Sequence, residues 1–106
     1  MMTVLGWPCA IDGQVLYIDR PLRVPIDTNV RHCVRALLRH GERDVVLDLT
    51  RVTSIDAAGL GELVRAHNMA RAVNGTVHVV NPGAWVRELI ERAGLGDLLL
   101  AERMIA

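Results

Sequence analysis

The chain has 106 residues, an apolar fraction of 51% and equal numbers of acidic and basic residues, twelve of each. This length suits one domain over residues 1–106. A formal net charge of zero gives no bulk electrostatic reason to bind nucleic acid or an anionic membrane. Two cysteines are too few for a disulfide framework or a zinc site. No run approaches the roughly 18 apolar residues of a membrane-spanning helix, and residues 1–10 do not have the pattern expected of a signal peptide. We therefore expect a cytoplasmic protein with no direct membrane insertion.

The chain opens with the pattern of a β-hairpin. Residues 3–11 and 14–18 are rich in β-formers, and Asp12-Gly13 between them is a strong two-residue hairpin signal. Pro8 lies inside the first run, so that strand is expected at a sheet edge or with a bulge.

The next elements are a helix and a strand. Asp27 or Thr28 is expected to cap the helix, and Gly41 to stop it. The helix has an apolar stripe at helical spacing, made of Val30, Cys33, Val34, Leu37 and Leu38. The strand at 44–49 is apolar enough to predict a central position in a sheet covered on both faces.

A long second helix is predicted over 57–73, stopped by Asn74-Gly75, and a strand follows at 76–80. Asn81 is expected to cap a third helix with Pro82 at its first position, running to Gly94. The remaining residues predict a short strand or a docked segment. Strands that alternate with helices indicate an α/β fold. We expect a mixed, mostly parallel sheet with an antiparallel N-terminal hairpin and about three main helices.

No group of residues in the chain predicts catalysis, so neither an enzyme, a cofactor nor a metal is expected. Ser54 is the single serine, and Cys33 falls on the core face of its helix. The four histidines show no spacing that pairs one with a nucleophile and a carboxylate, or that suits a metal: His32, His40, His67 and His78. The segment "DAAGLGE" matches no phosphate-binding motif, and the chain has no lysine for a P-loop.

Two aspartates favour structural roles over an acid–base pair. Asp56 stands directly before the second helix, where a carboxylate accepts bonds from free amides and faces the positive end of the helix dipole. Asp48, near the end of a strand, is expected to bond loop amides.

The start of the second helix contains two glycines, Gly59 and Gly61. Each glycine inside a helix costs about 0.5–1 kcal/mol relative to alanine. Their presence predicts that something approaches this backbone closely. Spacing alone leaves open whether that is the chain's own strand or loop, or another protein.

The segment "VVLDLTRVTSIDAAGLGELVRAHNMARAVNGTVHVVNP" carries a family resemblance. It resembles the central part of STAS domains, the fold of bacterial anti-sigma factor antagonists, and the match extends over about residues 14 to 96. The shared features are the order of elements, D-L-T at 48–50 and D-x-x-G-L-G at 56–61. The family's G-x-L-D turn before the first helix is not kept, and of Arg20 to Leu22 only the leucine matches.

The resemblance implies a non-catalytic interaction module in bacterial signal transduction and transcription regulation. In the antagonist branch, this helix start docks on an anti-sigma factor that is also a serine kinase of the histidine-kinase ATPase type. The kinase phosphorylates a Ser or Thr between the Asp and the Gly, which releases the antagonist. Carried over by position, the partner-binding residues are Asp56, Ala57, Ala58, Gly59, Leu60 and Gly61.

This chain departs from the family at the phosphoacceptor positions. Ala57 and Ala58 carry no hydroxyl, so the switch is expected to be absent there. Ser54 and Thr53 are the nearest hydroxyls, and neither is expected to replace it, because a kinase would have poor access to that apolar run. A second interpretation stays open, an accessory STAS subunit of a lipid-transport ABC system or of another signalling assembly. We expect a monomer or a weak dimer in either case.

Overall fold

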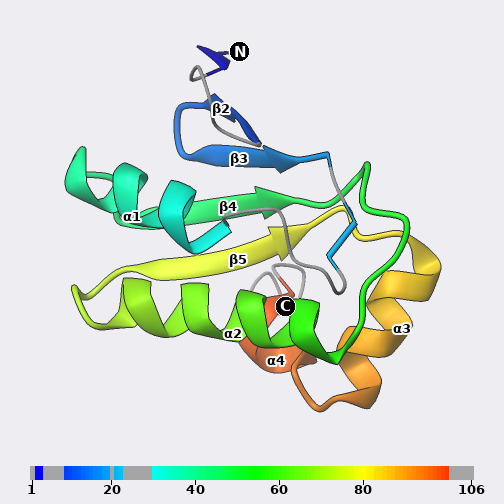
Figure 1. Ribbon diagram of the computed structural model, residues 1–106. Coiled ribbons are helices and arrows are strands. Elements are labelled where there is room, and N and C mark those ends of the chain that lie inside the picture. Colours follow the sequence, from blue (N-terminus) through cyan, green and yellow to red (C-terminus); the bar gives the residue numbers. More distant parts are fainter. Residues whose placement is uncertain (1, 4–8, 20, 23–29, 101–106) are drawn as a thin grey trace.

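The computed structural model describes residues 2–3, 9–19, 21–22 and 30–100. A mixed sheet with strand order β1-β2-β3-β4-β5 forms the centre of the domain, and the helices pack against this sheet (Figure 1). The elements in chain order are β1 (Met2–Thr3), β2 (Cys9–Asp12), β3 (Val15–Ile18), α1 (Val30–Arg39), β4 (Asp44–Asp48), α2 (Ala57–Arg71), β5 (Thr76–Val80), α3 (Ala84–Arg92) and α4 (Gly96–Leu99).

The N-terminal part of the sheet is antiparallel and the rest is parallel. The predicted hairpin is confirmed: β2 pairs antiparallel with β3, and Gly13 between them has a φ of 61°, which glycine adopts without strain. β3–β4 and β4–β5 are parallel pairs. The expected edge position of Pro8 and the start of α1 at Asp27 or Thr28 lie outside the described residues.

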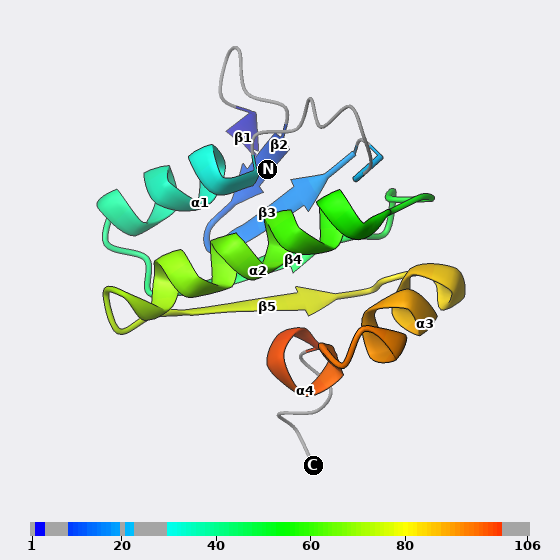
Figure 2. The same ribbon diagram turned by 60° about the horizontal axis from the view of Figure 1, so that its bottom comes forward.

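One face of the sheet forms the core. The register aligns Leu16, Leu47 and Val79 in one row across three strands, and all three are fully buried. α1 and α2 lie side by side over this face, while α3 and α4 lie beyond β5 (Figure 2). On the opposite face Val46 and His78 stay half-buried. β4 lies between β3 and β5, and the described helices α1 and α2 pack on one of its faces, while cover of the other face stays a prediction.

The chain after β4 is held by a segment distant in sequence. Leu22 forms a parallel bridge with Ile55: its amide donates to the Ser54 carbonyl, and its carbonyl accepts from the Asp56 amide, both at 3.0 Å. The leucine retained from the family turn thus fixes the loop directly before α2.

The C-terminal elements differ in detail from the sequence prediction. Asn81 does not cap α3: it has a φ of 54°, and Gly83 occupies the N-cap position without a side-chain bond. The Asn81 side chain instead bonds Asp48, which removes it from the helix end. The predicted docked segment is α4, and Leu100 after it forms a parallel bridge with Val79 on the edge of β5.

Candidate functional site

The start of α2 is capped as the sequence predicts. Asp56 has an extended backbone, and its Oδ1 accepts a hydrogen bond of 2.9 Å from the Gly59 amide. This satisfies one of the amides that have no partner within the helix. Asp56 is half-buried at the carboxyl end of the parallel strands, where β4 leads through its loop into α2. The Asp56 carboxylate therefore serves as the N-cap of α2.

Gly59 is required by the chain's own packing. A Cβ at this position would overlap the carbonyl oxygen of Leu22 and would lie 2.9 Å from Cγ1 of Ile55. The Leu22 carbonyl cannot withdraw easily because it accepts the Asp56 amide. The sequence left open whether the chain itself or another protein approaches these glycines. At Gly59 the neighbour is the chain's own Leu22, and Gly59 is buried.

Gly61 has a different environment. A Cβ there would meet only the Arg65 side chain, with 3.3 Å to its Nη1, which is the far end of a flexible group. No backbone of the described residues requires a glycine at this position. Ala57 is exposed, and Ala58, Leu60 and Gly61 are half-buried. We call Ala57, Ala58, Leu60 and Gly61 the α2-start surface.

Hydroxyl groups lie beside this surface but not within it. Ala57 and Ala58 occupy its first two positions, while Ser54 is half-buried and its carbonyl is bonded to Leu22. Thr53 is exposed. Thr53 is therefore not buried with the apolar run, and the expectation that a kinase does not use it stays a prediction.

Asp48 takes part in a separate set of hydrogen bonds that links the loops after β4 and β5. Its Oδ1 accepts the Thr50 amide at 2.8 Å and its Oδ2 accepts Nδ2 of Asn81 at 3.1 Å. Burial raises the pKa of this carboxyl, but the bonds from Thr50 and Asn81 outweigh it and hold the pKa below its usual value. The expectation that Asp48 bonds a loop amide is confirmed.

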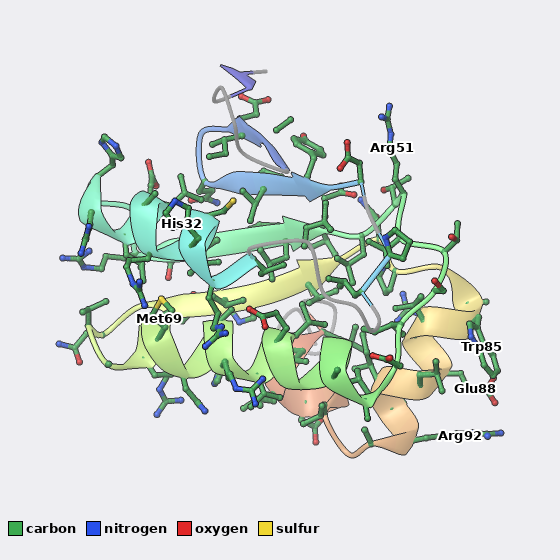
Figure 3. All side chains as sticks on the ribbon, in the orientation of Figure 1. His32, Arg51, Met69, Trp85, Glu88 and Arg92 are labelled. Carbon is green, nitrogen blue, oxygen red and sulfur yellow. The ribbon has the colours of Figure 1, made fainter. Side chains whose placement is uncertain are left out.

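Two features beside these residues have no signal in the sequence. A hollow of about 250 Å³ adjoins Asp48, lined by Ala10, Tyr17, Ile18, Asp19, Asp48, Thr50 and Arg51. Arg51 projects from the loop after β4 (Figure 3). Glu62, next to Gly61, accepts a bond of 2.7 Å from Nε of Arg31 on α1. Strand register and helix packing bring these groups together, so no local pattern could have predicted them.

The part of the chain that the structure describes has neither a cluster of metal-ligating side chains nor a membrane-spanning helix. No cluster of three or more His, Cys, Asp or Glu there could hold a metal ion. No helix among the same residues has the length and apolarity needed to cross a bilayer.

Comparison with known proteins identifies the family. A family model described as Mlab, STAS domain, matches residues 14–101. This is most of the chain, and the chain therefore belongs to the STAS-domain family. No curated protein sequence matches it significantly.

Solved structures support the same fold. The anti-sigma factor antagonist SpoIIAA in its unphosphorylated form is 18% identical, with a TM-score of 0.70, and 92% of this chain and 90% of that chain are covered. The protein TM1081 is 20% identical, with a TM-score of 0.68 and coverage of 93% and 82%. The Bacillus cell fate determinant SpoIIAA in its phosphorylated form is 19% identical, with a TM-score of 0.61 and coverage of 90% and 91%. The predicted α/β fold with an antiparallel N-terminal hairpin is confirmed, and at these identities the likeness extends to the fold alone.

Proposed function

We propose that this chain is a non-catalytic protein-interaction module of the anti-sigma factor antagonist type. It docks through Asp56 and the α2-start surface on an anti-sigma factor that is also a serine kinase of the histidine-kinase ATPase type. We place it in the bacterial cytoplasm as a monomer or weak dimer.

The observation that carries this proposal is the environment of Gly61. Gly59, two positions earlier, is explained by Leu22, whereas the described part of the chain gives no internal reason for Gly61. A glycine in a helix costs about 1 kcal/mol relative to alanine. A surface of small residues at a capped helix start allows a partner's backbone to approach closely, which supports docking at this place.

The experiment measures binding of the purified kinase-type proteins of the same genome by calorimetry. Gly61→Arg should abolish binding, because its long side chain would stand between two close backbones, while circular dichroism and thermal midpoint stay near wild type. Gly61→Ala is the matched control and should bind more strongly than Gly61→Arg. Undiminished binding by a folded Gly61→Arg protein would contradict docking at this surface.

We further propose that docking here has no phosphorylation switch within the loop. Ala57 and Ala58 provide no acceptor oxygen. After incubation with ATP and the binding kinase, mass spectrometry should find no phosphate on wild type, and Ala58→Ser should gain one. Ala58→Asp should bind more weakly, since it places a second carboxylate beside Asp56. Stoichiometric phosphate on Thr53 or Ser54 of wild type would show that the switch has moved to a neighbouring residue.

The two alanines also favour a second candidate, a partner that needs no phosphorylation cycle. Such a partner would be the ATPase subunit of a lipid-transport ABC system, with this chain as an accessory subunit. Copurification with an ATPase and a permease, and no affinity for any kinase-type protein, would select this candidate.

A further inference from the structure

The outer side of α1 is uniformly basic. Its sequence, VRHCVRALLR, contains three arginines and one histidine and no acidic residue, and His40 follows it directly. Its buried residues are Val30, Cys33, Val34 and Leu37, so the apolar side of the helix is used by the core. The basic side chains remain exposed on the opposite side. We call this set the α1 basic ridge: Arg31, His32, Arg35, Arg39 and His40.

Two of the three arginines of the ridge are not neutralised within the described residues. Arg31 pairs with Glu62, whose side chain is only 8% exposed, against 50% for that of Arg31. Arg35 and Arg39 form no ion pair with any residue that the structure describes. They are spaced four residues apart and therefore lie on the same side of the helix. The ridge presents two adjacent guanidinium groups to solvent.

Two hollows run along the ridge. The first, about 230 Å³, is lined by Arg31, His32, Arg35 and Glu62. The second, about 310 Å³, is lined by His32, Arg35, Ala36, Arg39 and His40. Both contain His32 and Arg35, so the hollows adjoin and form one irregular basic strip. Such a strip has room for side chains that enter between the arginines.

The ridge adjoins the α2-start surface. Glu62 directly follows Gly61, and its bond to Arg31 joins the two helices at this point. α1 lies beside α2 and runs in the same direction, and its first turn is the part nearest the start of α2 (Figure 2). A protein seated over Gly61 would therefore lie close to the first hollow of the ridge, which Glu62 also lines.

We propose that the α1 basic ridge binds an acidic face of the protein partner that docks at the α2-start surface. This inference rests on the proposed function and adds the chemistry of the partner. Planar guanidinium groups bind carboxylates through two parallel hydrogen bonds, which suits Arg35 and Arg39. The carboxylates of aspartate and glutamate side chains on one face of the partner would enter the hollows.

The composition of the ridge disfavours other anionic ligands. A helix that lies on a membrane inserts an apolar side into the lipid, and that side of α1 is buried in the core. Single-stranded nucleic acid is held mainly by large aromatic side chains that stack on bases, and the ridge has no Phe, Tyr or Trp. A carboxylate-bearing protein surface needs neither feature.

The test compares two double charge reversals in calorimetric titrations with the purified kinase-type proteins of the same genome. Arg35→Glu with Arg39→Glu should weaken binding at least about tenfold, because two attractive contacts become repulsive. The wild-type affinity should fall with added salt, and more steeply than that of this variant. Arg71→Glu with Arg92→Glu is the control: it changes the formal charge equally, and Arg92 lies on α3, away from His32 on α1 (Figure 3). This control should bind like wild type.

The possible results distinguish failure of the acidic-partner inference from failure of the proposed function. Binding that tolerates the ridge variant, or that falls equally with the control, overturns the acidic-partner inference and leaves docking at Gly61 intact. No binding to any kinase-type protein overturns the proposed function itself.

A second measurement tests the ridge without that partner. Amide NMR spectra during titration with a glutamate-rich peptide should shift along α1 and at Glu62, and the ridge variant should lose these shifts. Shifts spread evenly over other arginines would contradict the inference. Binding to vesicles of anionic phospholipid, or to single-stranded RNA, that depends on Arg35 and Arg39 and exceeds binding of the peptide would also contradict it.

Discussion

At the scale of single residues, two glycines of one motif serve different purposes. Gly59 lies against the Leu22 carbonyl, and a side chain would collide with backbone. Gly61, two positions on, would place a Cβ only near the mobile end of Arg65. The residue type is the same, but a rigid neighbour makes one glycine necessary for folding and the other available for function.

Alanine substitutions should separate these two glycines. Gly59→Ala should destabilise the protein by about 1–3 kcal/mol or more, because overpacking forces the backbone to shift. Gly61→Ala should be neutral or stabilise it by up to about 1 kcal/mol, through higher helix propensity. Thermal denaturation of both variants measures the difference, which corresponds to several degrees for a domain of this size. Equal midpoints would contradict the assigned packing at Gly59.

The Asp48 carboxylate should make stability depend on acid pH. Burial raises its pKa, but bonds from Thr50 and Asn81 outweigh this and leave the pKa lowered in the folded state. Its contribution is therefore fully present above the unfolded-state pKa of about 3.9 and is lost as pH falls through the lower, folded-state pKa.

Asp48→Asn tests this contribution. At neutral pH the variant should be destabilised by about 1–3 kcal/mol, because one acceptor oxygen is replaced by an NH2 donor and the remaining acceptor is uncharged. Urea unfolding between neutral and strongly acid pH should show a smaller acid loss in the variant than in wild type. If the free energy of unfolding fell with pH in parallel for the two proteins, another carboxyl group would be responsible for the loss of stability in acid.

At the scale of elements, α2 begins with residues that do not favour a helix start by themselves. Two glycines in its first turns oppose helix formation, and no acidic residue lies in its first turn. The Asp56 cap offsets this by accepting the Gly59 amide. The Leu22 segment holds Asp56 in place through its amide. The α2 start is thus defined by contacts from outside the helix.

Removal of the cap should weaken this element. Asp56→Ala should lower the free energy of unfolding by about 0.5–2 kcal/mol, which denaturant titration measures. Asp56→Asn keeps a capping oxygen and should lose only part of that amount, from the lost charge at the positive helix end. Similar losses in both variants would show that charge, rather than the cap bond, stabilises the helix start.

At the scale of the whole molecule, one hydrophobic cluster joins the sheet to its helices. It includes Leu16, Leu47 and Val79 from the strands, and Val34 and Leu63 from α1 and α2. Within the described residues, exposed large apolar side chains are few, namely Val73 and Trp85, and Trp85 points away from α3 into solvent (Figure 3).

A single shared core predicts cooperative unfolding. Urea denaturation followed by far-ultraviolet circular dichroism and by intrinsic fluorescence should give coincident two-state transitions, as for most small domains. α3 and α4 contact this core beyond β5 and should unfold with it. An early fluorescence transition, separate from the loss of helix, would show that the C-terminal elements form an independent unit.

The sequence by itself determined the order of the main helices and strands, the hairpin turn and the cap at Asp56, because these depend on period, turn chemistry and neighbours close in the chain. The D-x-x-G-L-G segment also marked the candidate site. Only the tertiary structure decided that Gly59 is packed by Leu22, that Asn81 bonds Asp48 instead of capping a helix, and that Arg31 meets Glu62. These contacts join residues more than thirty positions apart in the sequence, and no local propensity carries information about such distant partners.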